Sequence, residues 1–187
     1  MSKESPDRKQ SEELLETYIE SDSLRQHCRM VAMAMEAHAE ELGKSDDEIH
    51  EWWTAGLLHD LDWEKYPDEH PKKAVEEILP PLGYSMDVLT AIEAHAPGRT
   101  GKEPETEIER YLFACDEISG FMNAVALMRP NGFSDMKVKS VRKKLKDKRF
   151  AANVPREEIR KGAELINREL SEHIQFMIGI FRDLKID

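Results

Sequence analysis

A histidine-aspartate pair, His59-Asp60, ends the apolar stretch WWTAGLLHD, and further imidazole and carboxylate groups lie before and after it. Together with this pair, the candidate metal ligands are His27, His70, His95 and Asp116. Neutral imidazole and carboxylate suit Fe, Mn, Co, Ni or Zn, whereas Ca and Mg prefer shells made of oxygen. The set therefore predicts one or two divalent transition metals as cofactors.

The ordered spacing of the whole set favours a metal site more than any single residue does. A His-Asp dipeptide arises readily by chance in a chain with seven histidines, and one histidine on an apolar helix is most often a packing residue. Asp60 and Asp116 both lie beside apolar residues, and a buried carboxylate is costly unless a cation compensates it. The remaining histidines, His38, His50 and His173, are expected in packing or surface roles.

Hydrophobic periodicity is helical along the chain, and no run of alternating β-branched residues predicts a strand. We therefore expect an all-α fold, a single-domain helical bundle with a buried metal site. Ser23 is the expected N-cap of a helix that carries His27 and stops at Gly43. Ser45 and Glu48 form a capping box for the helix that leads to the His-Asp pair.

The later candidate ligands fall near predicted helix ends or on a long helix. Pro71 suits the first position of a helix, which makes His70 its expected N-cap. His95 ends a helix before the breaker-rich loop APGRTGKEP, and Asp116 lies near the middle of the next helix. The predicted helices after the His-Asp pair span about residues 71–83, 85–95, 105–128 and 155–184.

Length, charge and cysteine content exclude several classes of protein. The chain has 187 residues and a formal net charge of −11, so we expect one domain over residues 11–187 after a disordered tail over residues 1–10. The acidic balance argues against general nucleic-acid binding, and no apolar run approaches the ~20 residues of a membrane helix. Two cysteines exclude a disulfide framework and fit a reducing cytoplasm. A homo-oligomer remains open.

The ordered pattern H…HD…H…H…D resembles that of the HD-domain superfamily of metal-dependent phosphohydrolases, in its longer dinuclear version. The stretches GLLHDLDWEKYPDEHP, YLFACDEISGFMNAVALMRP and KVKSVRKKLKDKRFAA look like a bacterial group of small HDIG-type predicted hydrolases. The similarity covers about residues 20–180. The usual HDIGK continuation is absent, because Leu61-Asp62 replaces Ile-Gly and the nearest lysine, Lys65, comes two positions later.

This resemblance implies a dinuclear site. The implied ligands of the first metal are His27, His59, Asp60 and Asp116. A second metal would take His70 and His95, with Asp60 bridging both. The resemblance also marks His59 and Asp60 as the residues on which catalysis depends.

The function implied is hydrolysis of a small phosphate ester or nucleotide by a metal-bridged hydroxide, as in phosphomonoesterases or phosphodiesterases. No G-x-S-x-G, Walker or Cys-His motif offers a protein nucleophile. Asp62, Glu64 and Glu69 are candidates to protonate the leaving group. The ligands alone leave two alternatives open: a mixed-valent diiron oxygenase on the same scaffold, and a non-catalytic ligand-binding module.

Basic residues give candidate contacts for a small phosphorylated partner. Lys65 follows the His-Asp pair, Arg99 follows His95, and Arg129 follows the predicted helix over residues 105–128. A separate basic stretch, residues 137–149, holds eight Lys or Arg and one Asp, a local charge of +7. A solvated helix face explains such a stretch by itself, and attraction of an anionic partner is the functional alternative.

Overall fold

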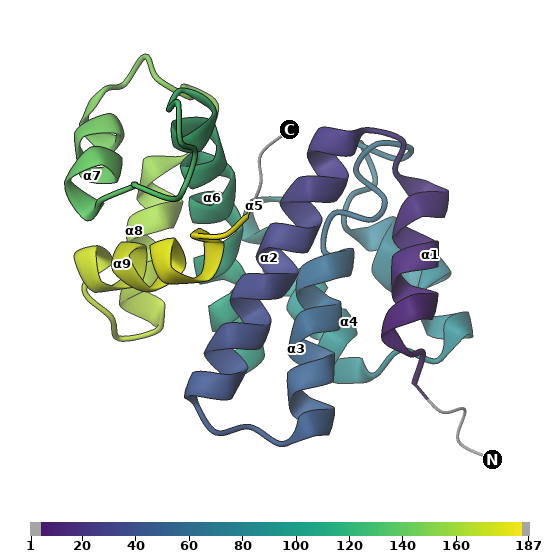
Figure 1. The fold of residues 1–187 in the computed structure, drawn as a ribbon. Coiled ribbons are helices and arrows are strands. Elements are labelled where there is room, and N and C mark those ends of the chain that lie inside the picture. Colours follow the sequence, from purple (N-terminus) through teal and green to yellow (C-terminus); the bar gives the residue numbers. More distant parts are fainter. Residues whose placement is uncertain (1–4, 185–187) are drawn as a thin grey trace. The chain divides into compact units, whose positions relative to one another are not determined.

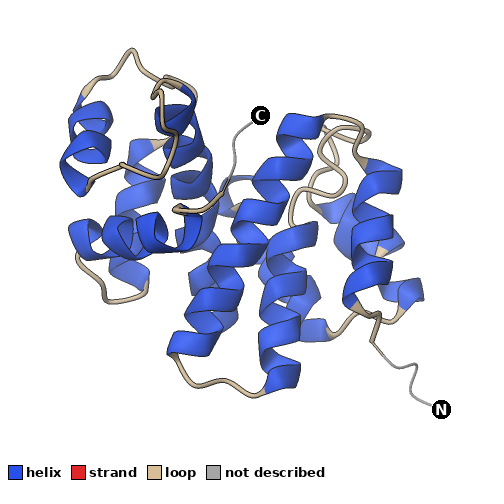
Figure 2. Ribbon diagram, in the orientation of Figure 1, coloured by secondary structure: helices blue, strands red, loops and turns tan. Residues whose placement is uncertain are grey.

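The computed structural model describes residues 5–184, and all regular secondary structure in this range is helical (Figure 2), which confirms the all-α prediction. In chain order (Figure 1) the elements are α1 (Arg8–Tyr18), α2 (Asp22–Glu41), α3 (Asp46–Leu58), a π-helical turn η1 (Ala74–Ile78), a 3-10 turn η2 (Pro80–Leu82), α4 (Met86–Ala94), α5 (Pro97–Thr100), α6 (Glu107–Leu127), α7 (Val138–Lys146), α8 (Arg156–Leu165) and α9 (Leu170–Phe181). No helix of the described range has the length and apolar character needed to cross a bilayer.

The helices gather into two compact units, and the first unit ends at Phe113. This boundary falls inside α6, so one continuous helix starts in the first unit and ends in the second. The sequence alone predicted one domain over residues 11–187 after a disordered tail over residues 1–10. Helix α1 starts at Arg8, so the last three residues of that predicted tail are helical, and residues 1–4 lie outside the described range.

Helix α3 is the central helix of the first unit. Its residues 52–58 are all buried, and α1, α2 and α4 pack against it. The closest approach is to α2, because a Cβ on Gly56 would lie 2.7 Å from the Cα of Ala32. Only glycine permits this backbone contact, which lets α2 and α3 run side by side (Figure 1).

Side-chain caps confirm two of the predicted helix starts. Ser45 and Glu48 form the expected capping box at α3, and Ser85 caps α4. Helix α2 starts earlier than predicted, because its N-cap is Ser21 and not Ser23. Both serines are good caps that precede the same apolar stripe, so periodicity alone does not choose between them.

The segment after the His-Asp pair differs from the prediction that Pro71 starts a helix with His70 as N-cap. Helical structure begins after Pro71 and passes into the π-helical turn η1. The backbone N–H of Ala74 donates to the carboxylate of Asp62, 2.8 Å away. A carboxylate from 12 residues upstream thus takes the capping role predicted for His70, and a search for caps among chain neighbours misses it.

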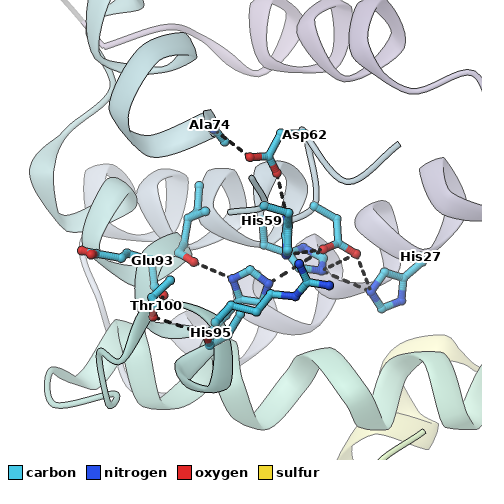
Figure 3. A network of polar contacts seen from close by, with 12 residues as sticks. His27, His59, Asp62, Ala74, Glu93, His95 and Thr100 are labelled. Carbon is cyan, nitrogen blue, oxygen red and sulfur yellow. Dashed lines mark hydrogen bonds and ion pairs between the residues drawn. The ribbon is translucent and has the colours of Figure 1, made fainter. Parts of the chain in front are cut away.

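Two further helix predictions need correction. The loop APGRTGKEP begins with the short helix α5, whose Thr100 hydroxyl donates to the carbonyl of Glu93 at 3.0 Å (Figure 3). The single helix predicted over residues 155–184 is broken into α8 and α9. Asn167 lies between them with φ 51°, a left-handed conformation that asparagine tolerates, and no proline or glycine marks the break.

The second unit has an aromatic core of its own. The rings of Phe133 and Phe181 pack with their centres 5.3 Å apart, and both side chains are buried. Helices α7 and α8 both contact α9, and a Cβ on Gly162 of α8 would lie 2.7 Å from the Cα of Ala114 in α6. The basic stretch at 137–149 forms α7 and the residues after it.

Candidate metal centre

Four histidines and Asp60 come together in the first unit from separate elements. His27 lies on α2, His59 and His95 follow the ends of α3 and α4, and His70 lies in the turns between these helices. Neighbouring imidazole rings have their centres 5.1 to 5.2 Å apart, in the order 27, 59, 95 and 70. Three of the rings are buried, whereas the side chains of His27 and Asp60 are 18% and 16% exposed. The cluster is therefore largely buried, and its exposed surface comes from His27 and Asp60.

The same local arrangement holds His59 and His95, both labelled in Figure 3. Each is the C-cap of its helix, and each Nδ1 donates to the carbonyl three residues earlier, Gly56 at 2.8 Å and Ile92 at 2.5 Å. Carbonyls in the last turn of a helix lack helical partners, so the imidazoles satisfy them. A carbonyl can only accept, so Nδ1 carries a proton and the neutral ring offers Nε2 to a metal.

Asp60 lies among the Nε2 atoms of the four histidines. Its Oδ2 is 3.4 Å from Nε2 of His59 and 3.8 Å from Nε2 of His27. Its Oδ1 is 3.5 Å from Nε2 of His70 and 3.8 Å from Nε2 of His95. Each carboxylate oxygen therefore faces one pair of imidazoles.

Asp62 fixes the orientation of His70. Its fully buried carboxylate accepts from Nδ1 of His70 at 2.7 Å through Oδ1, and from the N–H of Ala74 through Oδ2 (Figure 3). A carboxylate that accepts from the second nitrogen of a metal-binding histidine is a common arrangement in metalloproteins. The sequence placed Asp62 among the candidate acids, but both of its oxygens already have donors here. Its position eight residues before His70 was the only sequence signal of this role.

The donor set fits divalent transition metals. Ligand atoms of Asp60, His70 and His95 lie within 4.8 Å of one another, and the Nε2 atoms of His27 and His59 are 3.2 Å apart. A metal that binds its ligands at about 2.1 Å places neighbouring ligand atoms roughly 3 to 3.5 Å apart. Small movements of these side chains would suffice to bind a cation, and imidazole with carboxylate suits Fe, Mn, Co, Ni or Zn.

The sixth predicted ligand, Asp116, is the third residue of the second unit and lies on α6. Its assignment as a ligand stays a prediction. The three histidines outside the predicted set have other contacts. His38 packs against Tyr111, with ring centres 4.9 Å apart, while His50 and His173 each hydrogen-bond a backbone carbonyl. These contacts agree with packing and surface roles.

Trp63 lies between Arg99 and the histidine cluster, because its ring contacts both Arg99 and His70. Its guanidinium carbon lies 4.7 Å from the centre of the Trp63 ring, and Nη1 donates to the carbonyl of Pro67 at 2.8 Å. The same indole packs against His70 in a T-shaped contact, with ring centres 5.0 Å apart and planes nearly perpendicular. Arg99 is thus a cation held one aromatic ring away from the cluster.

The other two basic candidates bind different groups. Lys65 donates to the carbonyl of Thr17 at 2.7 Å, near the end of α1. Arg129 belongs to the second unit, where it forms an ion pair of 2.6 Å with Asp135. Both side chains thus have protein partners, and their role as substrate contacts stays a prediction.

The remaining candidate acids are engaged as well. Glu64 accepts from the backbone N–H groups of Glu20 and Ser21, both at 3.1 Å, just before α2. Glu69 lies 3.8 Å from the ammonium of Lys73. The loop after the His-Asp pair therefore anchors two helix starts, one through Asp62 and one through Glu64.

Comparisons with known proteins agree with this geometry. The HD domain matches residues 24–120, a range that covers more than half of the chain and contains all six predicted ligands. Neither the curated proteins nor the solved structures yield a match. With imidazoles gathered around a His-Asp pair at the end of a buried helix, and with this match, the chain belongs to the HD domain family.

Proposed function

We propose that this protein is a metal-dependent hydrolase that cleaves a small phosphate ester or nucleotide. The observation that carries the proposal is Asp60, whose two oxygens each face a pair of histidines. The proposed ligands of two metals, with Asp60 shared between them, are His27, His59 and Asp116 for one and His70 and His95 for the other. Bound divalent metals would supply Lewis acids that polarise the phosphoryl group and activate water.

The chain's own residues keep these ligands in one geometry. Backbone carbonyls fix the rings of His59 and His95, and Asp62 fixes the ring of His70. Rings held in advance need no reorganisation when charge develops on the substrate. The partly exposed side chains of His27 and Asp60 mark the edge by which substrate would enter.

Arg99 is the proposed contact for the substrate phosphate. A guanidinium has five donors, and one Nη1 bond to Pro67 leaves others available on the Trp63 face. Asp62, Glu64 and Glu69 have partners of their own, so we assign the leaving-group proton to water at the open edge.

The test begins with metal analysis of the protein purified without a histidine tag. Phosphomonoesters, nucleotides and cyclic dinucleotides are then assayed with Mn, Co, Ni and Fe. We expect about two metals per chain, and loss of activity in His59→Ala and Asp60→Ala. His50→Ala is the matched control, because it removes a histidine outside the cluster and should leave metal content and activity unchanged.

Other results would contradict parts of this proposal. A single metal per chain would remove His70 and His95 from the ligand set. Bound iron with a mixed-valence paramagnetic signal and oxygen uptake would make the protein an oxygenase. A protein that holds no metal, and whose ligand binding survives Asp60→Ala, would be a non-catalytic binding module.

We place this activity in the cytoplasm. Cys28 and Cys115 are both buried and form no disulfide, which suits a reducing compartment. Cell fractionation with an antibody against the protein would check the location.

A further inference from the structure

The second unit has a basic pocket that the metal chemistry does not use. Residues of α7, α8 and the start of α9 line it, and its volume is about 100 Å³. Its cationic lining residues are Arg142, Lys146, Arg156 and Arg160, and its other lining residues are apolar. None of the described carboxylates lines it. We refer to this site as the basic pocket.

The four cations form two like-charged pairs. Arg142 and Lys146 are four residues apart on α7, and Arg156 and Arg160 are four residues apart on α8. Residues at this spacing share a helix face, where like charges repel each other. The pocket brings both pairs together. A bound anion would offset their mutual repulsion, because it would attract all four cations.

Acidic side chains do little to offset these charges. Within residues 5–184, only Arg160 of the four forms an ion pair, with Glu157. Arg142 and Arg156 donate to neutral groups, a serine hydroxyl and backbone carbonyls of the segment before α8. The Nε of Arg156 is buried and has no acceptor in the described range. Three of the four cations thus lack a carboxylate partner.

We infer that the basic pocket binds a phosphate-bearing anion. Phosphate oxygens accept paired hydrogen bonds from guanidinium groups and carry the charge that the four cations lack. A water molecule takes about 30 Å³ in the liquid, so the pocket admits a phosphoryl group and not a nucleoside. Residues 114–187 also hold 15 of the 27 Lys and Arg but 11 of the 38 Asp and Glu, which draws anions to this unit. The inference does not depend on the proposed hydrolase function.

Calorimetric titration of the full-length protein tests this site. The probes are inorganic phosphate and glycerol phosphate, which separate free phosphate from a phosphate ester as the preferred form. We expect R142Q/K146Q to weaken binding at least tenfold, about 1.4 kcal/mol. The matched control K139Q/K148Q removes two charges of the same stretch outside the pocket, and should bind within twofold of wild type. His59→Ala should also retain binding.

Three outcomes would overturn the inference. Equal weakening in both double variants would show attraction by general surface charge. Loss of binding in His59→Ala, with R142Q/K146Q unaffected, would assign all phosphate binding to the metal centre. Tighter binding of a DNA duplex, weakened by both double variants, would make the stretch a nucleic-acid surface. Arg160→Gln, at an exposed position, serves as a second pocket variant if circular dichroism shows that R142Q/K146Q is misfolded.

Discussion

Asp62 connects the orientation of a candidate metal ligand to the start of a helical segment. Its carboxylate holds His70 on one oxygen and the backbone N–H of Ala74 on the other, without exposed surface. Hydrogen bonds to charged groups are worth about 1.5 to 3 kcal/mol each, and a buried donor left without its acceptor costs about as much. A change at this position therefore affects both stability and metal binding.

Replacing the carboxylate of Asp62 by an amide removes one of its two hydrogen-bond acceptors. We expect Asp62→Asn to lower metal affinity by about 10- to 100-fold, because asparagine offers one acceptor oxygen where aspartate offers two. Metal titration of the chelator-treated protein measures this. Glu64→Gln is the matched control, since Glu64 anchors the other side of the same loop through Glu20 and Ser21. A similar loss of affinity in both variants would assign the effect to the loop as a whole.

A second residue-scale prediction concerns Arg99. We expect Arg99→Lys to raise KM about tenfold with little change in kcat, because lysine loses the planar fork and the stacking on Trp63. Steady-state kinetics with the substrate found in the panel gives both constants. Arg129→Lys, which alters a cation paired with Asp135, should leave both unchanged. A fall in kcat at constant KM would show that Arg99 acts in the transition state instead.

At the scale of elements, the contact of α2 with α3 depends on one missing side chain. We expect Gly56→Ala to destabilise the protein by about 1 to 3 kcal/mol, because the added Cβ would meet the backbone of Ala32 at 2.7 Å. Urea unfolding measures the change. In Gly179→Ala the new Cβ meets no atom within 4 Å, so the same substitution should be neutral or stabilise α9 by up to about 1 kcal/mol. Equal destabilisation by both changes would contradict the close contact.

The start of α6 depends on a buried carboxylate. Burial opposes ionisation of Glu109, but bonds from the Lys102 ammonium and the backbone N–H groups of Thr106 and Glu105 outweigh it and hold the pKa of Glu109 below its ordinary 4.5. A carboxyl whose pKa is lower in the folded than in the unfolded chain stabilises the fold at any pH above its unfolded-state pKa. This stability is lost as the pH falls through its folded-state pKa.

We therefore expect Glu109→Gln to be less stable than wild type by about 1 to 3 kcal/mol at pH 7. The difference should be complete above pH 4.5 and shrink at lower pH. Urea unfolding of both proteins between pH 3 and pH 8 measures it. A difference that did not vary with pH would mean that Glu109 acts through packing and not through its charge.

Local signals account for which helices the sequence could predict. The side chains of Ser45 and Ser85 each accept from the backbone N–H three residues later, so the starts of α3 and α4 can be predicted from local sequence. The cap at Ala74 comes from Asp62, and the break at Asn167 has neither proline nor glycine, so both depend on tertiary structure or on a tolerated backbone conformation.

At the site, residue type and order along the chain were enough to name the four histidines that the structure gathers around Asp60. Which nitrogen faces Asp60 follows from carbonyls at Gly56 and Ile92, and these contacts exist only once the helix ends have formed. The partners of the basic candidates were not predicted: Lys65 donates to Thr17 near the end of α1, and Arg129 pairs with Asp135 in the loop that follows α6.

At the scale of the whole molecule, metal binding should stabilise the folded chain. Free metal at 100 times its Kd adds about 2.7 kcal/mol, which raises Tm by roughly 5 to 10 °C for a chain of this size. Calorimetry with added Mn and after chelation measures the shift, and amide exchange should slow mainly in α3 and α4. Asp60→Ala, which removes the ligand shared by both proposed metals, should show no such shift, and a shift that survived this change would place the metal elsewhere.

The positions of His59 and His95 have a further consequence for the order of events. Both residues cap the C-terminal ends of their helices, and the backbone dipoles of a helix sum to about half a negative charge at that end. The ends of α3 and α4 therefore add negative potential to that of Asp60. A site with this polarity attracts cations and repels phosphate until the cations are bound. For the proposed hydrolase we therefore expect metal to bind before the anionic substrate, an order that the helix ends favour.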